Sequence, residues 1–447
     1  MPEKSDDKNF KGKSFCDILS MLVPSFVKVY SASQGNSFID NNMPRRMQLS
    51  SLVFQLLFQD SGMAENLFNE FFADKEIKQF FGHKADEPIR LERAAAVSEM
   101  CVIDNSGNGG SQQPVSIISS ILLTAIDLSV LERGEMIESD IISNIPKAFE
   151  RFKMYIRKEP VPEEHLIGVS GFQVENGVKI GLGELSAKSL NDFQSSYFFG
   201  HDKNVFLALQ IPFERKMIFA GTFEQLQQYL KSVSSQSIFT DRENLNRIIR
   251  DIRLSLVLSL SNDEKAFPAF IEDDYLITSS GGAMSFMWSN NNQPRKISDM
   301  KLAKKDVSKI SIKYLTISNK DISSINVAIK RLLSAVCSRD DPDDALIDAV
   351  MCWENVIGSD KEVTFKVCSS IAKVLSKRQD DRIDILRELK DIYELRSKLV
   401  HGSSKYKTDL KQINSAIIYA IKLMNVILDD DEMMKSPDRS RYILLEN

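Results

Sequence analysis

Histidine and cysteine, two residue types that often hold metal ions, are scarce in this sequence. Among 447 residues there are four histidines (His83, His165, His201 and His401) and five cysteines. None of them has the close spacing of a zinc site, and no Cys-x-x-Cys pair occurs. Because the cysteines are scattered and odd in number, we expect reduced core residues and no bound metal.

Motifs that would hold a nucleotide or activate a serine are also missing. The sequence has no P-loop and no Gly-x-Ser-x-Gly motif. The segment Gly181-Leu182-Gly183 lacks the third glycine and the acidic residue of a dinucleotide-binding fingerprint, so it predicts a tight turn. We therefore expect no cofactor.

Charge of one sign and long apolar runs are both limited. The formal net charge is -5, which argues against a general nucleic-acid coat but leaves room for a local basic site. The first residues, Met1 to Lys13, are polar, and no signal peptide or membrane-spanning run is expected after them. These features predict a cytoplasmic protein without a membrane partner.

The pattern of apolar residues divides the chain into four regions. Residues 1–150 are expected to be mainly helical, and 151–318 to form an α+β region with a hairpin at Phe172–Ile180, turning at Asn176-Gly177. Residues 319–430 are predicted to form a helix bundle, and 431–447 a loose polar tail. The predicted fold class is α+β, predominantly helical.

Five amphipathic helices with short connections are expected in the C-terminal bundle, which indicates an up-and-down arrangement. Their expected positions are from near Asn319 to Val336, Asp343–Gly358, Glu362–Leu375, Arg382–His401, and a fifth helix that is capped by Thr408 and runs to Leu428.

Two charged residues interrupt the apolar faces of these helices. In the fourth helix, Arg396 points in the same direction as Leu389 and Val400 at about 100° per residue, and in the second helix Glu354 lies among apolar residues. An unpaired buried charge is strongly destabilising, so we expect the two helices to pack and Glu354 to meet Arg396. The structural alternative is a salt bridge that only fixes helix register.

Arg396 and His401 suit cleavage of RNA by its own 2′-hydroxyl. An imidazole can transfer protons near neutral pH, and a guanidinium can bind a phosphate through paired donors. A base removes the hydroxyl proton, an acid protonates the leaving 5′-oxygen, and a cation stabilises the phosphorane. None of these steps requires a metal.

The segment Leu395-Arg396-Ser397-Lys398-Leu399-Val400-His401-Gly402 resembles the Arg-x4-His signature of the HEPN superfamily. With Asp344–Gly358 and Lys361–Val367 before it, the last quarter of the chain looks like the Apea-like HEPN branch. Ile121–Leu128 resembles the region that precedes the module in that branch, with Asp127 where an arginine is usual.

This resemblance implies a composite active site formed across a homodimer. Arg396 and His401 would be catalytic, and Ser397 takes the place of the polar helper that follows the arginine in many members. Glu354 would support Arg396. Lys398, Lys405 and Lys407 are candidate RNA-binding residues in the groove, although each also fits an ordinary solvated basic face.

The sequence thus predicts a metal-independent HEPN endoribonuclease whose substrate is RNA and which acts as a dimer or larger assembly. By family association it would be an anti-phage abortive-infection toxin, with the α+β region sensing a phage-derived trigger. Two alternatives stay open. One is a non-catalytic HEPN module for dimerisation or RNA binding, and the other is a HEPN partner of a separate nucleotidyltransferase.

Overall fold

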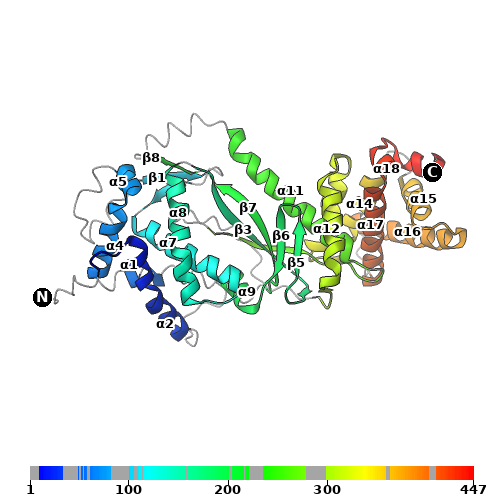
Figure 1. Ribbon diagram of the computed structural model, residues 1–447. Coiled ribbons are helices and arrows are strands. Elements are labelled where there is room, and N and C mark those ends of the chain that lie inside the picture. Colours follow the sequence, from blue (N-terminus) through cyan, green and yellow to red (C-terminus); the bar gives the residue numbers. More distant parts are fainter. Residues whose placement is uncertain are drawn as a thin grey trace. The chain divides into compact units, whose positions relative to one another are not determined.

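The protein is predominantly helical with a smaller β component, which confirms the predicted fold class (Figure 1). The computed structural model describes residues 10–33, 49, 52–53, 55–57, 61–81, 100–104, 109–112, 114–157, 159–200, 204–215, 217–220, 235–277, 298–358, 363–401 and 409–446.

The chain divides into two compact units that do not follow the sequence in single blocks. Unit 1 comprises Met1–Gly168, Lys188–Leu245 and Glu272–Arg295, and unit 2 comprises Val169–Ala187, Asn246–Ile271 and Lys296–Asn447. The predicted bundle of 319–430 lies within unit 2, which also takes in earlier segments of the chain.

Unit 1 is built around two long helices, α7 (Pro114–Arg133) and α8 (Glu138–Ile156). By length and composition α7 is apolar enough to cross a membrane, so the expectation of no such run was wrong. However, α7 is mostly buried within the protein, as in the core helix of a water-soluble domain. Asp127 of α7 is fully buried and accepts a hydrogen bond from the Tyr197 hydroxyl at 2.8 Å.

The strands in the described part of the chain form three sheets. One is antiparallel with the order β2-β1-β8, where Val102 is opposite both Gly110 and Phe219. The largest has the order β5-β6-β7-β3-β9, and a two-stranded sheet joins β10 to β4. The strands are β1 (Met100–Asp104), β2 (Gly109–Gln112), β3 (Val161–Ser170), β4 (Gln173–Val174), β5 (Lys179–Leu182), β6 (Leu185–Ser189), β7 (Leu207–Arg215), β8 (Met217–Ala220), β9 (Phe270–Ile277) and β10 (Lys301–Leu302).

The predicted hairpin at Phe172–Ile180 is wrong in its pairing. The chain does turn at Gly177, whose φ is 74°, but β4 pairs in parallel with β10 and β5 pairs with β6. The hairpin that forms is β5–β6, with Gly183 in its turn at a φ of 71°. The Asn176-Gly177 dipeptide therefore predicted a turn correctly, but it did not predict which strands are hydrogen-bonded to each other.

Unit 2 contains the helices expected from the apolar pattern. They are α13 (Asn326–Cys337), α14 (Pro342–Ile357), α15 (Val363–Leu375), α16 (Gln379–Val400) and α17 (Leu410–Asp429). A further helix, α12 (Val307–Ser318), precedes them and was not predicted. In this unit α14 packs against α13, α15, α16 and α17. The α17 N-cap is Asp409, whose carboxylate accepts from the Lys411 amide, whereas Thr408 lies outside the described residues.

The C-terminal tail is not loose, contrary to expectation. It forms α18 (Asp431–Lys435), α19 (Arg439–Arg441) and η6 (Tyr442–Glu446), with Met433, Met434 and Ile443 buried. The Arg439 guanidinium, also buried, donates to the carbonyl oxygens of Val356 at 3.1 Å and Met434 at 2.8 Å. The apolar side chains and this arginine, which satisfies carbonyls near helix C-termini, hold the tail on the unit.

Besides Glu354, α14 carries another charged residue among its apolar residues. This residue, Asp348, is buried, with 1% of its surface exposed. Its carboxylate accepts hydrogen bonds at 2.7 Å from each of Arg331, Ser334 and Arg339. Burial by itself would raise the pKa of Asp348, but these hydrogen bonds offset burial and hold the pKa below its usual range. Asp348 therefore fixes α14 against α13 and the following loop as a carboxylate.

We expect Asp348→Asn to lower the free energy of unfolding by about 3 kcal/mol at pH 7, because it removes a buried charge from its hydrogen-bonded partners. Because folding lowers the pKa of Asp348, the stability that its carboxylate gives to the folded protein is present above about pH 4. This stability is lost as the pH falls further. Urea unfolding followed by tryptophan fluorescence should show the gap between wild type and variant closing below pH 4.

The matched control is Asp344→Asn, one turn away on α14. Asp344 is 51% exposed and bonds the same Arg339 at 3.2 Å, so its loss should cost less than about 0.5 kcal/mol. Equal effects of the two substitutions would contradict the role assigned to Asp348.

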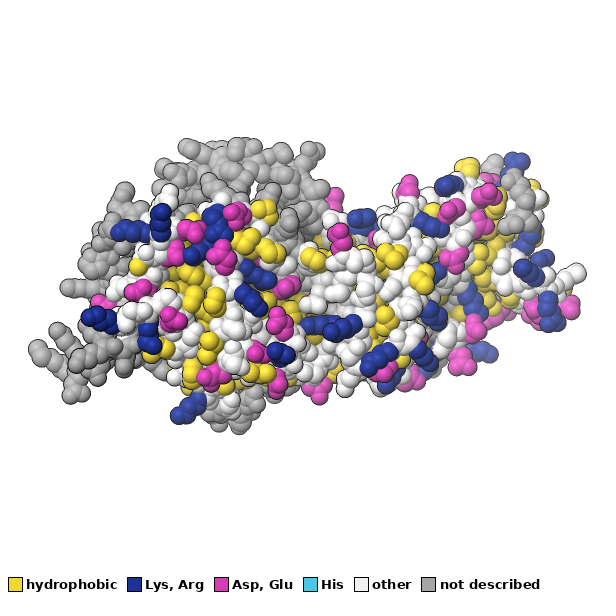
Figure 2. All heavy atoms as spheres, viewed as in Figure 1, with side chains coloured by type: hydrophobic (Ala, Val, Ile, Leu, Met, Phe, Trp, Pro, Cys, Tyr) yellow, Lys and Arg dark blue, Asp and Glu magenta, His cyan; other side chains and the backbone are white. Residues whose placement is uncertain are grey.

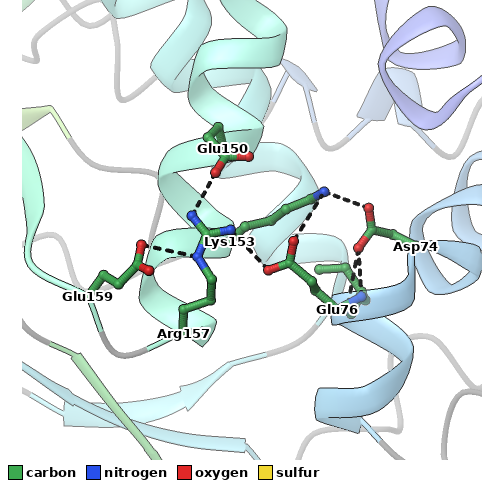
Figure 3. Close-up of polar contacts among 7 residues, drawn as sticks. Asp74, Glu76, Glu150, Lys153, Arg157 and Glu159 are labelled. Atoms are coloured by element: carbon green, nitrogen blue, oxygen red, sulfur yellow. Dashed lines mark hydrogen bonds and ion pairs between the residues drawn. The ribbon is translucent and has the colours of Figure 1, made fainter.

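An ion-pair network joins α5 (Lys75–Phe81) and the residue before it to α8 in unit 1 (Figure 3). Arg157 bonds Glu76 at 3.0 Å, Glu150 at 2.6 Å and Glu159 at 3.0 Å. Lys153 contacts Asp74 at 2.7 Å and Glu76 at 3.9 Å. The hydrogen bonds that Arg157 donates to its carboxylate partners, the one to Glu150 first, raise the pKa of Arg157. Three of the ion pairs in the network therefore depend on one guanidinium.

Replacing Arg157 with methionine should leave its three carboxylate partners repelling one another and lower the free energy of unfolding by about 1 kcal/mol. The loss should shrink in 0.5 M salt, which screens the repulsion. Arg133→Met, which breaks a single pair with Asp140 at a 61% exposed arginine, is the control and should have little effect. Urea titrations at two salt concentrations test both.

Candidate functional site

The predicted contact between Glu354 and Arg396 is present in unit 2. The helices that carry them, α14 and α16, pack together, and Arg396 Nη2 lies 3.6 Å from Glu354 Oε2. The two side chains are 23% and 24% exposed, so the pair lies at the edge of the core. An ion pair at this depth keeps contact with solvent.

The apolar pattern predicted that Arg396 lies in the middle of the buried face of α16. It lies instead at the border of that face. Leu389, Ile392 and Leu395 are buried, whereas Val400 is 50% exposed. The last turn of α16 therefore leaves the core, which places Arg396 between buried residues and solvent.

Tyr393 belongs to the same cluster and was not predicted as a site residue. Its hydroxyl donates a short hydrogen bond to Glu354 Oε1, and its ring centroid lies 6.0 Å from Arg396 Cζ. Burial, together with the hydrogen bond to Glu354 and the charge of that carboxylate, raises the pKa of Tyr393 to about 12. The position of Tyr393 three residues before Arg396 was the available signal, since such residues share a helix face.

His401 is the C-cap residue of α16 and its side chain is exposed. Its backbone N–H donates to the Ser397 carbonyl at 3.1 Å, which ends the helix. In the described part of the chain, no hydrogen bond or ion pair joins His401 to Arg396. Five residues on a regular helix separate the two side-chain directions by about 140°, which agrees with this.

The other predicted site residues have separate positions. Ser397 is half-buried and follows Arg396 on α16, and Lys398 pairs with Glu394 at 2.7 Å. This pair lowers the pKa of Glu394 and partly neutralises the lysine. Lys405 and Lys407 lie outside the described residues. Of the predicted basic groove, only Lys398 is therefore described, and it has a carboxylate partner.

No metal cluster is seen in the described regions. No group of three or more His, Cys, Asp or Glu side chains is placed there to hold a metal ion. On the face in Figure 2, lysine and arginine side chains are interspersed with aspartate and glutamate over the residues shown in colour.

We expect Tyr393→Phe to reduce stability at neutral pH, since Glu354 loses a hydrogen bond. The deficit should shrink above pH 10. Folding raises the pKa of Tyr393, so the native protein holds the hydroxyl proton more tightly than the unfolded chain does. The wild type loses the stability that this proton contributes as the pH rises from about 10 towards 12, whereas the variant has no such contribution to lose. Urea unfolding of both proteins from pH 8 to 11 measures this, and a constant difference would contradict it.

Comparison of the chain with protein-family models, curated proteins and solved structures gives no match. The resemblance of its last quarter to the Apea-like HEPN branch therefore stays a prediction from its motifs. The geometry of Glu354, Tyr393, Arg396 and His401 is the evidence that bears on function.

Proposed function

We propose that the protein is a metal-independent endoribonuclease of HEPN type in which Arg396 binds the scissile phosphate and His401 transfers protons. The observation that carries the proposal is the last turns of α16. There a partly exposed guanidinium is oriented by Glu354, and an exposed imidazole follows five residues later.

Each residue has a defined part in the reaction. One His401 removes the proton from a ribose 2′-hydroxyl, whose oxygen then attacks the adjacent phosphorus. Arg396 stabilises the negative charge that builds up on the phosphorane oxygens. The bond to the 5′-oxygen breaks as an acid protonates it. The products are a 2′,3′-cyclic phosphate and a 5′-hydroxyl end.

The need for both a base and an acid favours a homodimer. One chain offers a single His401, directed away from Arg396. A two-fold axis would bring a second copy of α16 to the same cleft and supply the second imidazole. The composite site is also what the HEPN resemblance implies, so both lines of reasoning lead to the dimer.

The biological role proposed here rests on family association. As an Apea-like HEPN protein, the chain would act in the cytoplasm on cellular RNA as an abortive-infection effector against phage. Residues 151–318 would sense the phage-derived trigger or restrain the nuclease until it arrives.

The test is cleavage of a fluorescent single-stranded RNA by the purified protein, with and without EDTA. His401→Ala and Arg396→Gln should each lower the rate at least about 100-fold, because each removes one element of transition-state stabilisation. EDTA should have no effect, and an all-2′-O-methyl RNA should stay intact. Arg387→Ala is the matched control, since Arg387 is an exposed arginine of α16 that pairs with Asp384.

One observation also favours a non-catalytic module. The charge of Arg396 already has a partner in Glu354, as expected of a salt bridge that fixes helix register. Intact RNA after incubation with a folded, dimeric wild type would establish this reading, with or without RNA binding. Recovery of a nucleotidyltransferase on pull-down would instead favour the partner role.

A further inference from the structure

We propose that Tyr393 is a positioning residue that keeps Glu354 from forming a bidentate pair with Arg396, and so leaves guanidinium donors to bind an RNA phosphate. This rests on the proposed function as far as the phosphate is concerned. The control of Arg396 by Tyr393 follows from the geometry of the cluster alone.

The two oxygens of the Glu354 carboxylate serve different partners. Oε1 accepts the hydrogen bond from the Tyr393 hydroxyl, and Oε2 is the atom nearest to Arg396, at 3.6 Å from Nη2. A bidentate arginine–carboxylate pair has two parallel hydrogen bonds of roughly 2.7–2.9 Å. The pair seen here is thus an ion pair at longer range, because one carboxylate oxygen is held elsewhere.

Arg396 consequently keeps unused donors. A guanidinium has five N–H groups, and among the described residues none of those of Arg396 makes a hydrogen bond. Its Nε atom is buried without a partner, although about a quarter of the side chain is exposed. An arginine that is held in one orientation, and whose N–H donors are not all used, is suited to bind an incoming anion.

Tyr393 is well placed to maintain this state. It lies one turn before Arg396 on α16, and its hydroxyl is directed to Glu354 Oε1 by their hydrogen bond. The raised pKa of Tyr393 keeps the hydroxyl protonated, and therefore a donor, throughout the neutral range. Without it, Arg396, whose Nη2 atom already lies 3.6 Å from Oε2 of the same carboxylate, can donate to the freed Oε1 atom of Glu354.

The same unit provides a matched control. Tyr419 of α17 donates to Glu388 Oε2 of α16 at 2.6 Å, and both side chains are half-buried. Burial and the bond to Glu388 raise the pKa of Tyr419 as well. No arginine is paired with Glu388 in the part of the chain that the structure describes. Tyr419→Phe therefore removes a similar hydrogen bond without affecting a cation.

The first measurement does not depend on nuclease activity. Phenylglyoxal reacts with accessible guanidinium groups, and peptide mass spectrometry of the full-length protein gives the rate at Arg396. Tyr393→Phe should slow the reaction about tenfold, because Glu354 then forms a bidentate pair with Arg396. The double variant Tyr393→Phe with Glu354→Gln should restore the rate, and Tyr419→Phe should leave it unchanged.

The second measurement is RNA cleavage. In Tyr393→Phe the KM for RNA should rise about tenfold with little change in kcat, and Glu354→Gln in that background should reverse the rise. A merely structural role for Tyr393 would not be rescued by altering Glu354.

The outcomes separate the two proposals. An unchanged reaction rate at Arg396 in Tyr393→Phe overturns the role of Tyr393, whatever the nuclease assay gives. Slower modification that Glu354→Gln reverses, in a protein that cleaves no RNA, supports the role of Tyr393 and rejects the endoribonuclease.

Discussion

A carboxylate on an otherwise apolar helix face must be met by donors, and this constraint governs the arrangement of unit 2. The helix α14 carries two such groups, Asp348 and Glu354. Asp348 is fully enclosed and draws Arg331, Ser334 and Arg339 around it, which fixes α14 against α13. Glu354, six residues later, meets Tyr393 and Arg396 of α16. Because α14 also packs on α15 and α17, these two carboxylates help determine the register of the whole bundle.

The two carboxylates differ in how completely hydrogen-bond donors satisfy them. This difference distinguishes the stabilising role of Asp348 from the binding role proposed for the cluster around Glu354. Asp348 accepts three hydrogen bonds at 2.7 Å, a saturated arrangement suited to stability. Glu354 has one strong hydrogen bond and one longer ion pair, and the guanidinium it orients is left with free donors. Polar groups at the edge of a core that lack hydrogen-bond partners lower stability. Their presence at Arg396 is therefore a reason to consider a binding role.

Much of this organisation could be predicted because it follows from helical periodicity. Apolar residues at helical spacing predicted α14 through α17 to within a few residues, and the glycine after Ile357 marked the end of α14, where Gly358 has a φ of 65°. The charges of Glu354 and Arg396 within apolar faces predicted their contact across 42 residues, since each needed a partner of opposite sign.

The sequence by itself determined the helical segments α14 to α17, the predominantly helical α+β class and the pairing of Glu354 with Arg396. Only the tertiary structure decided which strands pair beside Gly177, that the tail docks through Arg439, and that Tyr393 shares the carboxylate of Glu354. The physical reason is the range of the interactions. Periodicity is a property of neighbouring residues, whereas a hydrogen-bond partner is chosen among all groups that folding brings within about 3 Å.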